Sequence, residues 1–350
     1  MAVKHVDWNQ EYPEVPETVH RSVLHALSAL DEQEQEVRRM KKAPKKRIIL
    51  LAAALAALVG TTAAAAGVFR WNDRAEQVFE ADEEMQKELT MNQMAEEVSQ
   101  TVTDQGLTIT AIQTIQDRNR FYALFEVTAE DAGMQITSDC SMDYTLDFGG
   151  NEDPFCAREW GFVSESDQEV SNTRYFEIRG TKHEESDEDL VMNLHFTGLR
   201  GEPAQKAGEG ELLVSGTWDF SLNLRTSDMI SHEVEREYEV DGYGVYIKSV
   251  AFSPLSMTIV YDGADVRAME AGKEICLDQL DELTELYPTG VRYADGTVVN
   301  EGTVDGGVMI PLSEGFRNGE ETFELLLPFN KVVDPGQINA LLIGDVAIEL

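Results

Sequence analysis

The chain has 350 residues, of which 42% are hydrophobic and 8% aromatic, which is enough to build two or three packed domains. It carries 28 Lys and Arg against 65 Asp and Glu, a formal net charge of -37. Such an acidic surplus repels phosphate backbones, so we expect no direct nucleic-acid partner. The three cysteines and six histidines are too scattered for a zinc knuckle or a redox pair, so we also expect no metal and no cofactor.

Residues 1–47 read as a short tail with one amphipathic helix, which starts near Pro16 and Glu17. Its apolar stripe, with spacings of four, four and three, consists of Val19, Val23, Leu27 and Leu30. A lone helix is marginal in water, so this stripe needs a cover. Two covers remain open: the inner membrane leaflet, with anionic lipid bound by the basic run Arg38–Arg47, or a cytoplasmic partner protein that receives the stripe.

The 22 residues Ile48–Phe69 contain no charge and predict a single transmembrane helix, since a helix of this length spans about 33 Å. The rival interpretation is a signal peptide, with Ala63 and Ala65 at cleavage spacing, but 47 preceding residues are too long for a usual signal-peptide n-region. Small residues recur every fourth position and would let two helices approach closely as a homodimer: Ala52, Ala56, Gly60 and Ala64.

Orientation follows from the charges beside the span. Seven Lys and Arg residues lie in Arg38–Arg47, whereas only Arg70 and Arg74 follow soon after the span. The positive-inside rule then places the N-terminus in the cytoplasm. We therefore expect a single-pass protein of the cell membrane with an extracellular C-terminal ectodomain.

The ectodomain should begin with a juxtamembrane helix or stalk at residues 70–100. After it, alternating apolar residues bounded by turn-formers predict strands from Leu107 onward, including Leu213–Leu224, in a first β-sandwich-like module at residues 101–226. The polar segment 227–237 reads as a linker. A second strand series gives a second module at residues 238–350. The predicted fold is an all-β ectodomain of two β-sandwich, Ig-like modules, with one transmembrane helix and a short helical cytoplasmic tail.

Two local features of the second module are clear in the sequence. The segment Val291–Val299 predicts a hairpin with Asp295-Gly296 in a tight primed turn. The terminal residues Val346, Ile348 and Leu350 alternate, which predicts a strand that runs to the end of the chain.

Chemistry-bearing motifs are missing from the sequence. It contains no nucleophile elbow, no zinc-protease helix and no phosphate-binding glycine loop, so we do not expect an enzyme and name no catalytic residue. His195 lies between Leu194 and Phe196 in an alternating strand and reads as a sheet residue. Cys140 and Cys156 bracket a strand and turn, and a disulfide between them would stabilise the fold by about 3 kcal/mol.

Several short motifs resemble a Gram-positive family of membrane-anchored ectodomains of unknown function. They are the Val15-Pro16-Glu17 start, the Ala/Leu span behind a basic run, Val102–Ile112 leading to Phe121–Phe125, and then Gly216–Phe220, Ser253–Ile259 and Asp295–Thr297. The resemblance implies an anti-sigma-factor-like role, with a sigma factor bound at the tail helix. The tail has no cysteine, unlike zinc-bearing anti-sigma proteins.

Two functions are therefore expected as alternatives. The first is a membrane-anchored, anti-sigma-factor-like regulator that senses or binds an extracellular ligand with its ectodomain. The second is a passive cell-envelope binding or structural module without a signalling role. The two differ in whether the tail helix binds a cytoplasmic protein.

Overall fold

The computed structural model describes residues 70–350, apart from 150–152, 165–170, 183–188, 202–209, 241, 274–285, 300–309, 318–319, 330 and 345. The predicted tail helix and the predicted span at 48–69 lie outside this part. Within the described residues, no helix has the length and apolar character needed to cross a membrane.

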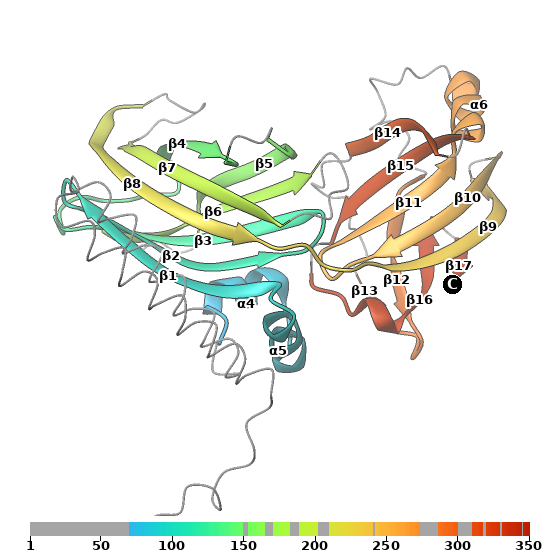
Figure 1. Ribbon diagram of the computed structural model, residues 1–350, viewed down its shortest axis with the longest axis horizontal. Coiled ribbons are helices and arrows are strands. Elements are labelled where there is room, and N and C mark those ends of the chain that lie inside the picture. Colours follow the sequence, from blue (N-terminus) through green and yellow to red (C-terminus); the bar gives the residue numbers. More distant parts are fainter. Residues whose placement is uncertain are drawn as a thin grey trace, which may run out of the picture.

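The described chain starts with two short helices and continues into a first module of eight antiparallel strands (Figure 1). The helices, called the helical pair below, are α4 (Asp73–Phe79) and α5 (Glu83–Met91). The strands are β1 (Ala95–Asp104), β2 (Leu107–Gln116), β3 (Arg120–Ala129), β4 (Ser141–Asp147), β5 (Phe155–Phe162), β6 (Thr173–Lys182), β7 (Leu190–Arg200) and β8 (Leu212–Leu224). They form one sheet in the order β1-β2-β3-β6-β5 and another in the order β4-β7-β8.

An aromatic core joins these two sheets. The ring of Phe125 on β3 lies 5.4 Å from that of Phe196 on β7 and 5.6 Å from that of Phe220 on β8. The alternation predicted from the sequence is confirmed over the second half of β8, where four apolar residues are buried: Trp218, Phe220, Leu222 and Leu224. Alternation thus tells which face of each strand points into the core.

The second module packs two further antiparallel sheets on a core of its own. Its elements are β9 (Ile230–Val240), β10 (Tyr243–Phe252), β11 (Ser256–Asp262), α6 (Gly263–Lys273), β12 (Pro288–Tyr293), β13 (Val298–Val299), β14 (Ile310–Arg317), β15 (Glu320–Pro328), the 3-10 turn η3 (Pro335–Gln337), β16 (Ile338–Ile343) and β17 (Val346–Glu349). The sheets are β14-β15-β11-β10-β9 and β13-β12-β16-β17. The described chain is thus mostly β, as predicted.

The predicted hairpin at Val291–Val299 is present, with a different turn. Val291 pairs with Val299, and the backbone nitrogen of Tyr293 donates to the carbonyl of Thr297 at 2.8 Å. Gly296 has a φ of 90°, whereas Asp295 is not in the left-handed region. A primed Asp-Gly turn has a positive φ at both central residues, whereas here only the glycine has one. The prediction of a primed turn was therefore wrong.

The segment predicted as a linker is mostly strand. β9 covers Ile230–Val240 and pairs along its length with β10. The difference arises because β9 is an edge strand, and every second residue from Glu233 to Glu239 is an exposed glutamate. Its sequence therefore looks like that of a polar linker. Only Val234 and Val240 of this strand are buried. The last strand agrees with the sequence: β17 pairs with β16, and the backbone nitrogen of Leu350 donates to Asn339 at 2.9 Å.

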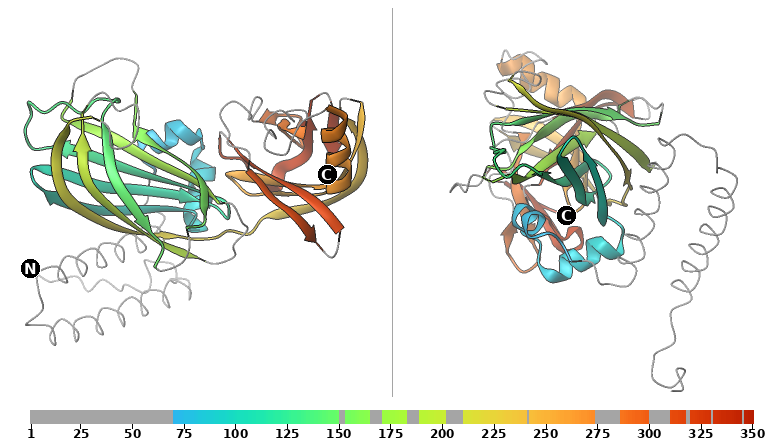
Figure 2. Two further views of the ribbon diagram at one scale, coloured as in Figure 1. Left: turned by 90° about the horizontal axis from the view of Figure 1, so that it is seen from above. Right: turned by 90° about the vertical axis from the view of Figure 1, so that its left-hand side faces the viewer.

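The two modules lie side by side, and the helical pair lies at the end of the first module that faces the second (Figures 1 and 2). A third apolar cluster occupies this place and takes residues from all three parts, among them Phe79 of α4, Tyr122 of β3 and Leu255 between β10 and β11. We call this region the junction.

Candidate functional site

Local capping explains why the chain leaving residue 70 forms two short helices. The side chain of Asn72 accepts from the backbone nitrogen of Arg74, and that of Asp82 accepts from the backbone nitrogen of Met85, both at 2.9 Å. Glu80 ends α4 in the left-handed conformation, with a φ of 47°. The turn leads directly into α5, and both helices contribute to one apolar cluster, with Ala75 and Phe79 from α4 and Leu89 from α5.

These apolar residues cover the first module at the junction. Trp71 is only 2% exposed. Its ring lies edge-on to Phe79 at 6.3 Å, and Phe79 in turn lies edge-on to Tyr122 of β3 at 5.1 Å. The indole nitrogen of Trp71 donates to the hydroxyl of Thr90 on α5 at 3.4 Å, so the segment before α4 is also held to α5. Burial of this aromatic series anchors the helical pair on the sheet.

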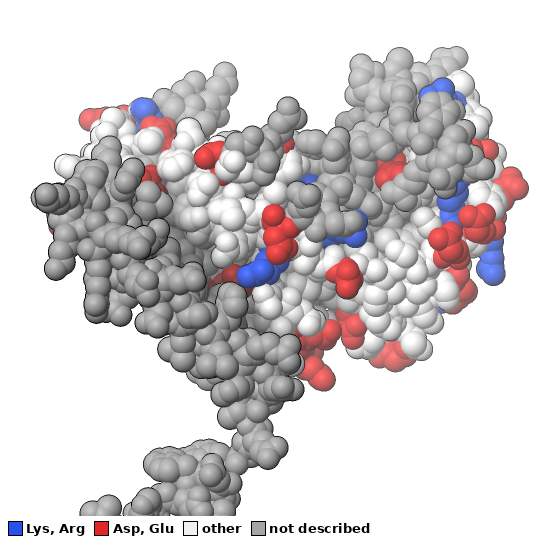
Figure 3. Space-filling view, in the orientation of Figure 1, with Lys and Arg blue, Asp and Glu red and all other residues white. Residues whose placement is uncertain are grey.

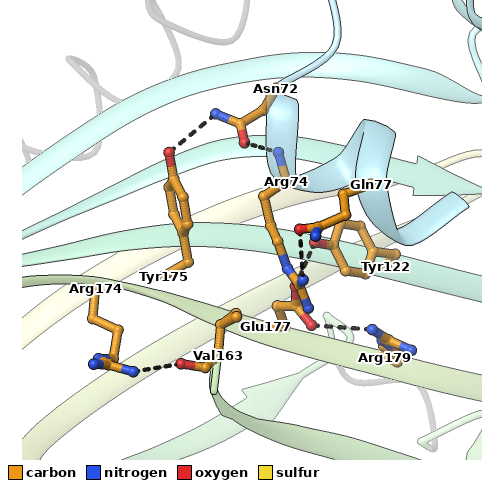
Figure 4. A network of polar contacts seen from close by, with 9 residues as sticks. All are labelled: Asn72, Arg74, Gln77, Tyr122, Val163, Arg174, Tyr175, Glu177 and Arg179. Atoms are coloured by element: carbon orange, nitrogen blue, oxygen red, sulfur yellow. Dashed lines mark hydrogen bonds and ion pairs between the residues drawn. The ribbon is translucent and has the colours of Figure 1, made fainter. Parts of the chain in front are cut away.

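A polar network holds α4 to the same sheet (Figure 4). The Nε of Arg74 lies 2.6 Å from Glu177 Oε1 on β6, and Arg179 Nη2 lies 3.1 Å from Glu177 Oε2. The hydroxyl of Tyr122 donates to Glu177 at 3.0 Å. One carboxylate therefore accepts from three side chains on three elements.

The network shifts the acidity of its members. Burial raises the pKa of the Glu177 carboxyl, but the hydrogen bond from Arg74 and the positive charges of Arg179 and Arg74 outweigh it, so that pKa lies below its ordinary value. Burial, and then the charge of Glu177, raise the pKa of Tyr122. At neutral pH the network therefore contains an ionised Glu177 and a protonated Tyr122. Asn72 adds a contact beside it, donating to the Tyr175 hydroxyl at 3.5 Å.

A buried carboxylate links the first module to the second. Asp117, in the turn between β2 and β3, is 2% exposed. One oxygen accepts from the backbone nitrogens of Asn119 and Arg120, at 2.8 and 2.7 Å. The other accepts from Leu255 N at 3.1 Å and Ser256 Oγ at 2.9 Å, and also from the hydroxyl of a further residue of that turn, Ser253. Asp117 thus holds the β2–β3 turn against the β10–β11 turn of the other module.

The helical pair also contacts the second module directly. The backbone nitrogen of Val332 donates to the carbonyl of Phe79 at 3.1 Å, and Lys331 Nζ lies 2.5 Å from Glu80 Oε2. The Nη1 of Arg120 crosses from the first module and donates to the carbonyl of Phe329 at 3.0 Å. Three parts of the chain therefore meet at one place, and none can move without changing contacts to the others.

A small pocket of about 50 Å³ opens at the junction. It is bordered by all three parts: Val78, Phe79, Arg120, Phe121, Tyr122, Arg179, Leu255 and Phe329. Elsewhere on the surface acidic side chains predominate along the lower and right-hand margins of the face in Figure 3, and basic ones form small groups.

None of the residues predicted from the sequence as sites is among the described residues of the junction. Val19, Val23, Leu27, Leu30 and the basic run 38–47 are outside the described residues, as are the small residues of the span. Cys140 is a buried free thiol, and the side chain of Cys156 is outside the described part, so their disulfide stays a prediction. His195 Nδ1 lies 2.9 Å from Asp219 Oδ1 on an exposed face, and the described residues contain no group of side chains arranged to hold a metal ion.

Sequence reasoning did not identify the junction residues Asp117, Arg120 and Glu177. From the sequence, Asp117 was recognisable only as a residue that favours a turn, and Ser253–Ile259 only as one of the short motifs that resemble the family. Their roles depend on contacts between residues far apart, such as the 139 positions between Asp117 and Ser256. Such contacts leave no pattern in a single sequence.

Comparison with known proteins gives limited matches. A family model described as "Domain of unknown function (DUF4179)" matches residues 40–129, which includes the helical pair and strands β1 to β3. This agrees with the expected resemblance to a family of unknown function. Among solved structures, the chain is similar to "The crystal structure of the conserved domain protein from Bacillus anthracis", with 13% identity, a TM-score of 0.43, and coverage of 71% of this chain and 76% of that one. No curated protein matches the chain.

Proposed function

We propose that this protein is a single-pass, membrane-anchored regulator of the anti-sigma-factor-like type. Its N-terminal tail is cytoplasmic, the segment 48–69 is the transmembrane helix, and the two-module ectodomain is outside the cell. In this proposal the ectodomain binds an extracellular ligand, and the tail helix binds a sigma factor with Val19, Val23, Leu27 and Leu30.

The observation that best supports the proposal is where the chain enters the described fold. Residues 71–79 follow the proposed membrane segment directly, and three of them, Trp71, Ala75 and Phe79, are buried at the junction instead of forming a free tether. A passive anchor needs only a flexible connection, which has no reason to be buried against two modules. A regulator needs a path along which a change in the ectodomain reaches the membrane segment, and α4 supplies one through Phe79 and Arg74.

The tail is tested by placing charge on its apolar stripe in the full-length protein. Val23→Asp with Leu27→Asp puts two carboxylates on the proposed contact, which destabilises a packed interface unless they find partners. If the protein inhibits a sigma factor, reporter transcription from that factor's promoters should rise. His25→Asp with Ser28→Asp is the matched control, because these positions lie on the opposite side of the same predicted helix.

Binding is then measured separately from transcription. Full-length protein is paired in a two-hybrid assay with each extracytoplasmic-function sigma factor of the host, and the tail is titrated with anionic and neutral vesicles. A sigma factor that binds the wild type and the control pair, but not the stripe variant, supports the proposal. Unchanged reporter output, together with binding to anionic vesicles alone, would identify a passive envelope module.

A further inference from the structure

The junction pocket has an unusual charge balance for so acidic a protein. The two charged residues among its described lining are both arginines, Arg120 and Arg179, while the whole chain has a net charge of -37. The rest of the lining is apolar or aromatic, and includes Phe79 of α4 and Leu255 and Phe329 of the second module. An apolar pocket with two guanidinium groups on one side is suited to a ligand with one anionic end.

Arg120 is the stronger observation, because part of its guanidinium has no hydrogen-bond partner among the described residues. Among the described residues no carboxylate forms an ion pair with its guanidinium; Nη1 donates to the carbonyls of Phe329 and Leu255, at 3.0 and 3.5 Å. Its Nε is enclosed and has no hydrogen-bond acceptor. Burial lowers the pKa of Arg120 to about 10, although the nearby charges of Asp117 and Glu159 act in the opposite direction.

Arg179 contributes the second guanidinium group of the pocket. Its side chain is 33% exposed and its guanidinium carbon lies 5.7 Å from the centre of the Tyr122 ring. Its one hydrogen bond to another described residue runs from Nη2 to Glu177. Glu177 already accepts from Arg74 and Tyr122 as well, so this carboxylate has little capacity left to neutralise the pocket. Donor groups on both arginines therefore remain for a ligand.

We propose that the junction pocket binds a small carboxylate, which lies between the guanidinium groups of Arg120 and Arg179 with its short apolar part against Phe79, Leu255 and Phe329. A carboxylate matches the planar donor fork of arginine and carries a single charge. A phosphate dianion fits less well, because the apolar lining offers no further donors for its remaining oxygens. The volume of about 50 Å³ holds roughly three or four water-sized groups, which limits the ligand to a few carbon atoms or to the carboxyl end of a longer molecule.

Such a ligand would contact the helical pair and both modules at once. It would therefore bind only when the junction is assembled, and would stabilise that arrangement by linkage. Whether binding of this ligand regulates anything depends on the regulatory function proposed above. The binding itself does not, because all the lining residues lie within residues 78–329.

The test is a calorimetric titration of the full-length protein in detergent with sodium propionate, at ionic strength held constant with sodium chloride. We expect saturable binding that Arg179→Gln and Arg120→Gln each weaken by about tenfold or more, since each removes charge-assisted hydrogen bonds. Arg236→Gln is the control and should bind like the wild type, because Arg236 is an exposed residue on β9, away from the lining. Propionate should also raise the unfolding temperature of the wild type and of this control.

Two comparison ligands make the result specific. Ethylammonium chloride has a similar size and the opposite charge, and should not bind; inorganic phosphate should bind more weakly than propionate. Absence of saturable propionate binding, equal affinity in Arg179→Gln, or tighter binding of phosphate would overturn the proposal. Arg179→Gln decides the matter if Arg120→Gln does not fold, as judged by circular dichroism. The sigma-factor reporter measures a different quantity, so failure of either proposal is recognised separately.

Discussion

The carboxylate of Asp117 accepts a hydrogen bond from the backbone nitrogen of Leu255, 138 positions later, at 3.1 Å. This contact joins a turn of the first module to a turn of the second, and both residues are buried. Leu255 also belongs to the apolar cluster that holds the helical pair. A single pair of residues thus connects the interface between the modules with the segment that follows the proposed membrane helix.

Replacement of Asp117 should destabilise the protein strongly. Asp117→Ala leaves buried donors without an acceptor, among them the nitrogen of Leu255 and the hydroxyl of Ser256, and we expect a loss of about 3 kcal/mol or more. Differential scanning calorimetry measures the change. Asp131→Ala is the control, because Asp131 accepts a hydrogen bond in an exposed turn, and it should change stability little. Equal unfolding temperatures for the two variants would show that Asp117 is not important for holding the modules together.

Acidification should weaken the attachment of α4 through Glu177. The folded-state pKa of this carboxyl lies below its ordinary value of 4.5, so its contribution to stability is fully present above that value. It is lost as the pH falls through the folded pKa. Glu177→Gln should therefore lower stability at neutral pH and flatten its dependence on pH in the acid range, measured by urea unfolding. Glu88→Gln, at an exposed position of α5, should keep the wild-type acid dependence; the same flattening in both variants would contradict the assignment.

The C-terminal strand should be essential for the stability of the second module. Ile348 is buried in the core of that module, and β17 pairs with β16 through Ile343–Val346 and three further residue pairs. Ile348→Ala should cost about 2–5 kcal/mol through lost burial and the cavity left behind. Deletion of residues 345–350 should cost more, because the ladder is lost as well. Ala347→Ser, at an exposed position of the same strand, should unfold at nearly the wild-type temperature, and a tolerated deletion would contradict this role.

The proposed topology is tested by thiol labelling on intact cells, in a variant without the three native cysteines. Ser28→Cys should be protected from an impermeant reagent, since the tail is proposed to be cytoplasmic. Met91→Cys should be labelled, because Met91 is 65% exposed at the end of α5. Lysed cells provide the control in which both thiols react. The reverse pattern, or a secreted protein that begins near residue 66, would overturn the proposal.

The sequence predicted the strands better than it predicted the junction. Alternation on β8 follows from two-residue periodicity, which is local, and all its predicted inward residues are buried. Most of β9 was predicted as a linker, because one face of this strand is acidic and exposed. Helix α6 was missed because its 11 residues begin with glycine and lack a clear apolar stripe. The enclosed Nε of Arg120 and the shared carboxylate of Glu177 arise only when distant strands come together.

The entry point of the chain has a mechanical consequence. The second described residue, Trp71, already belongs to the apolar cluster of the junction. A force exerted through the preceding residues would therefore load Trp71 and α4 first. These residues pack across the aromatic series and the Arg74–Glu177 pair, so the load would shear these contacts before it reached either sandwich core. The junction would yield first, while both modules stayed folded on either side of it.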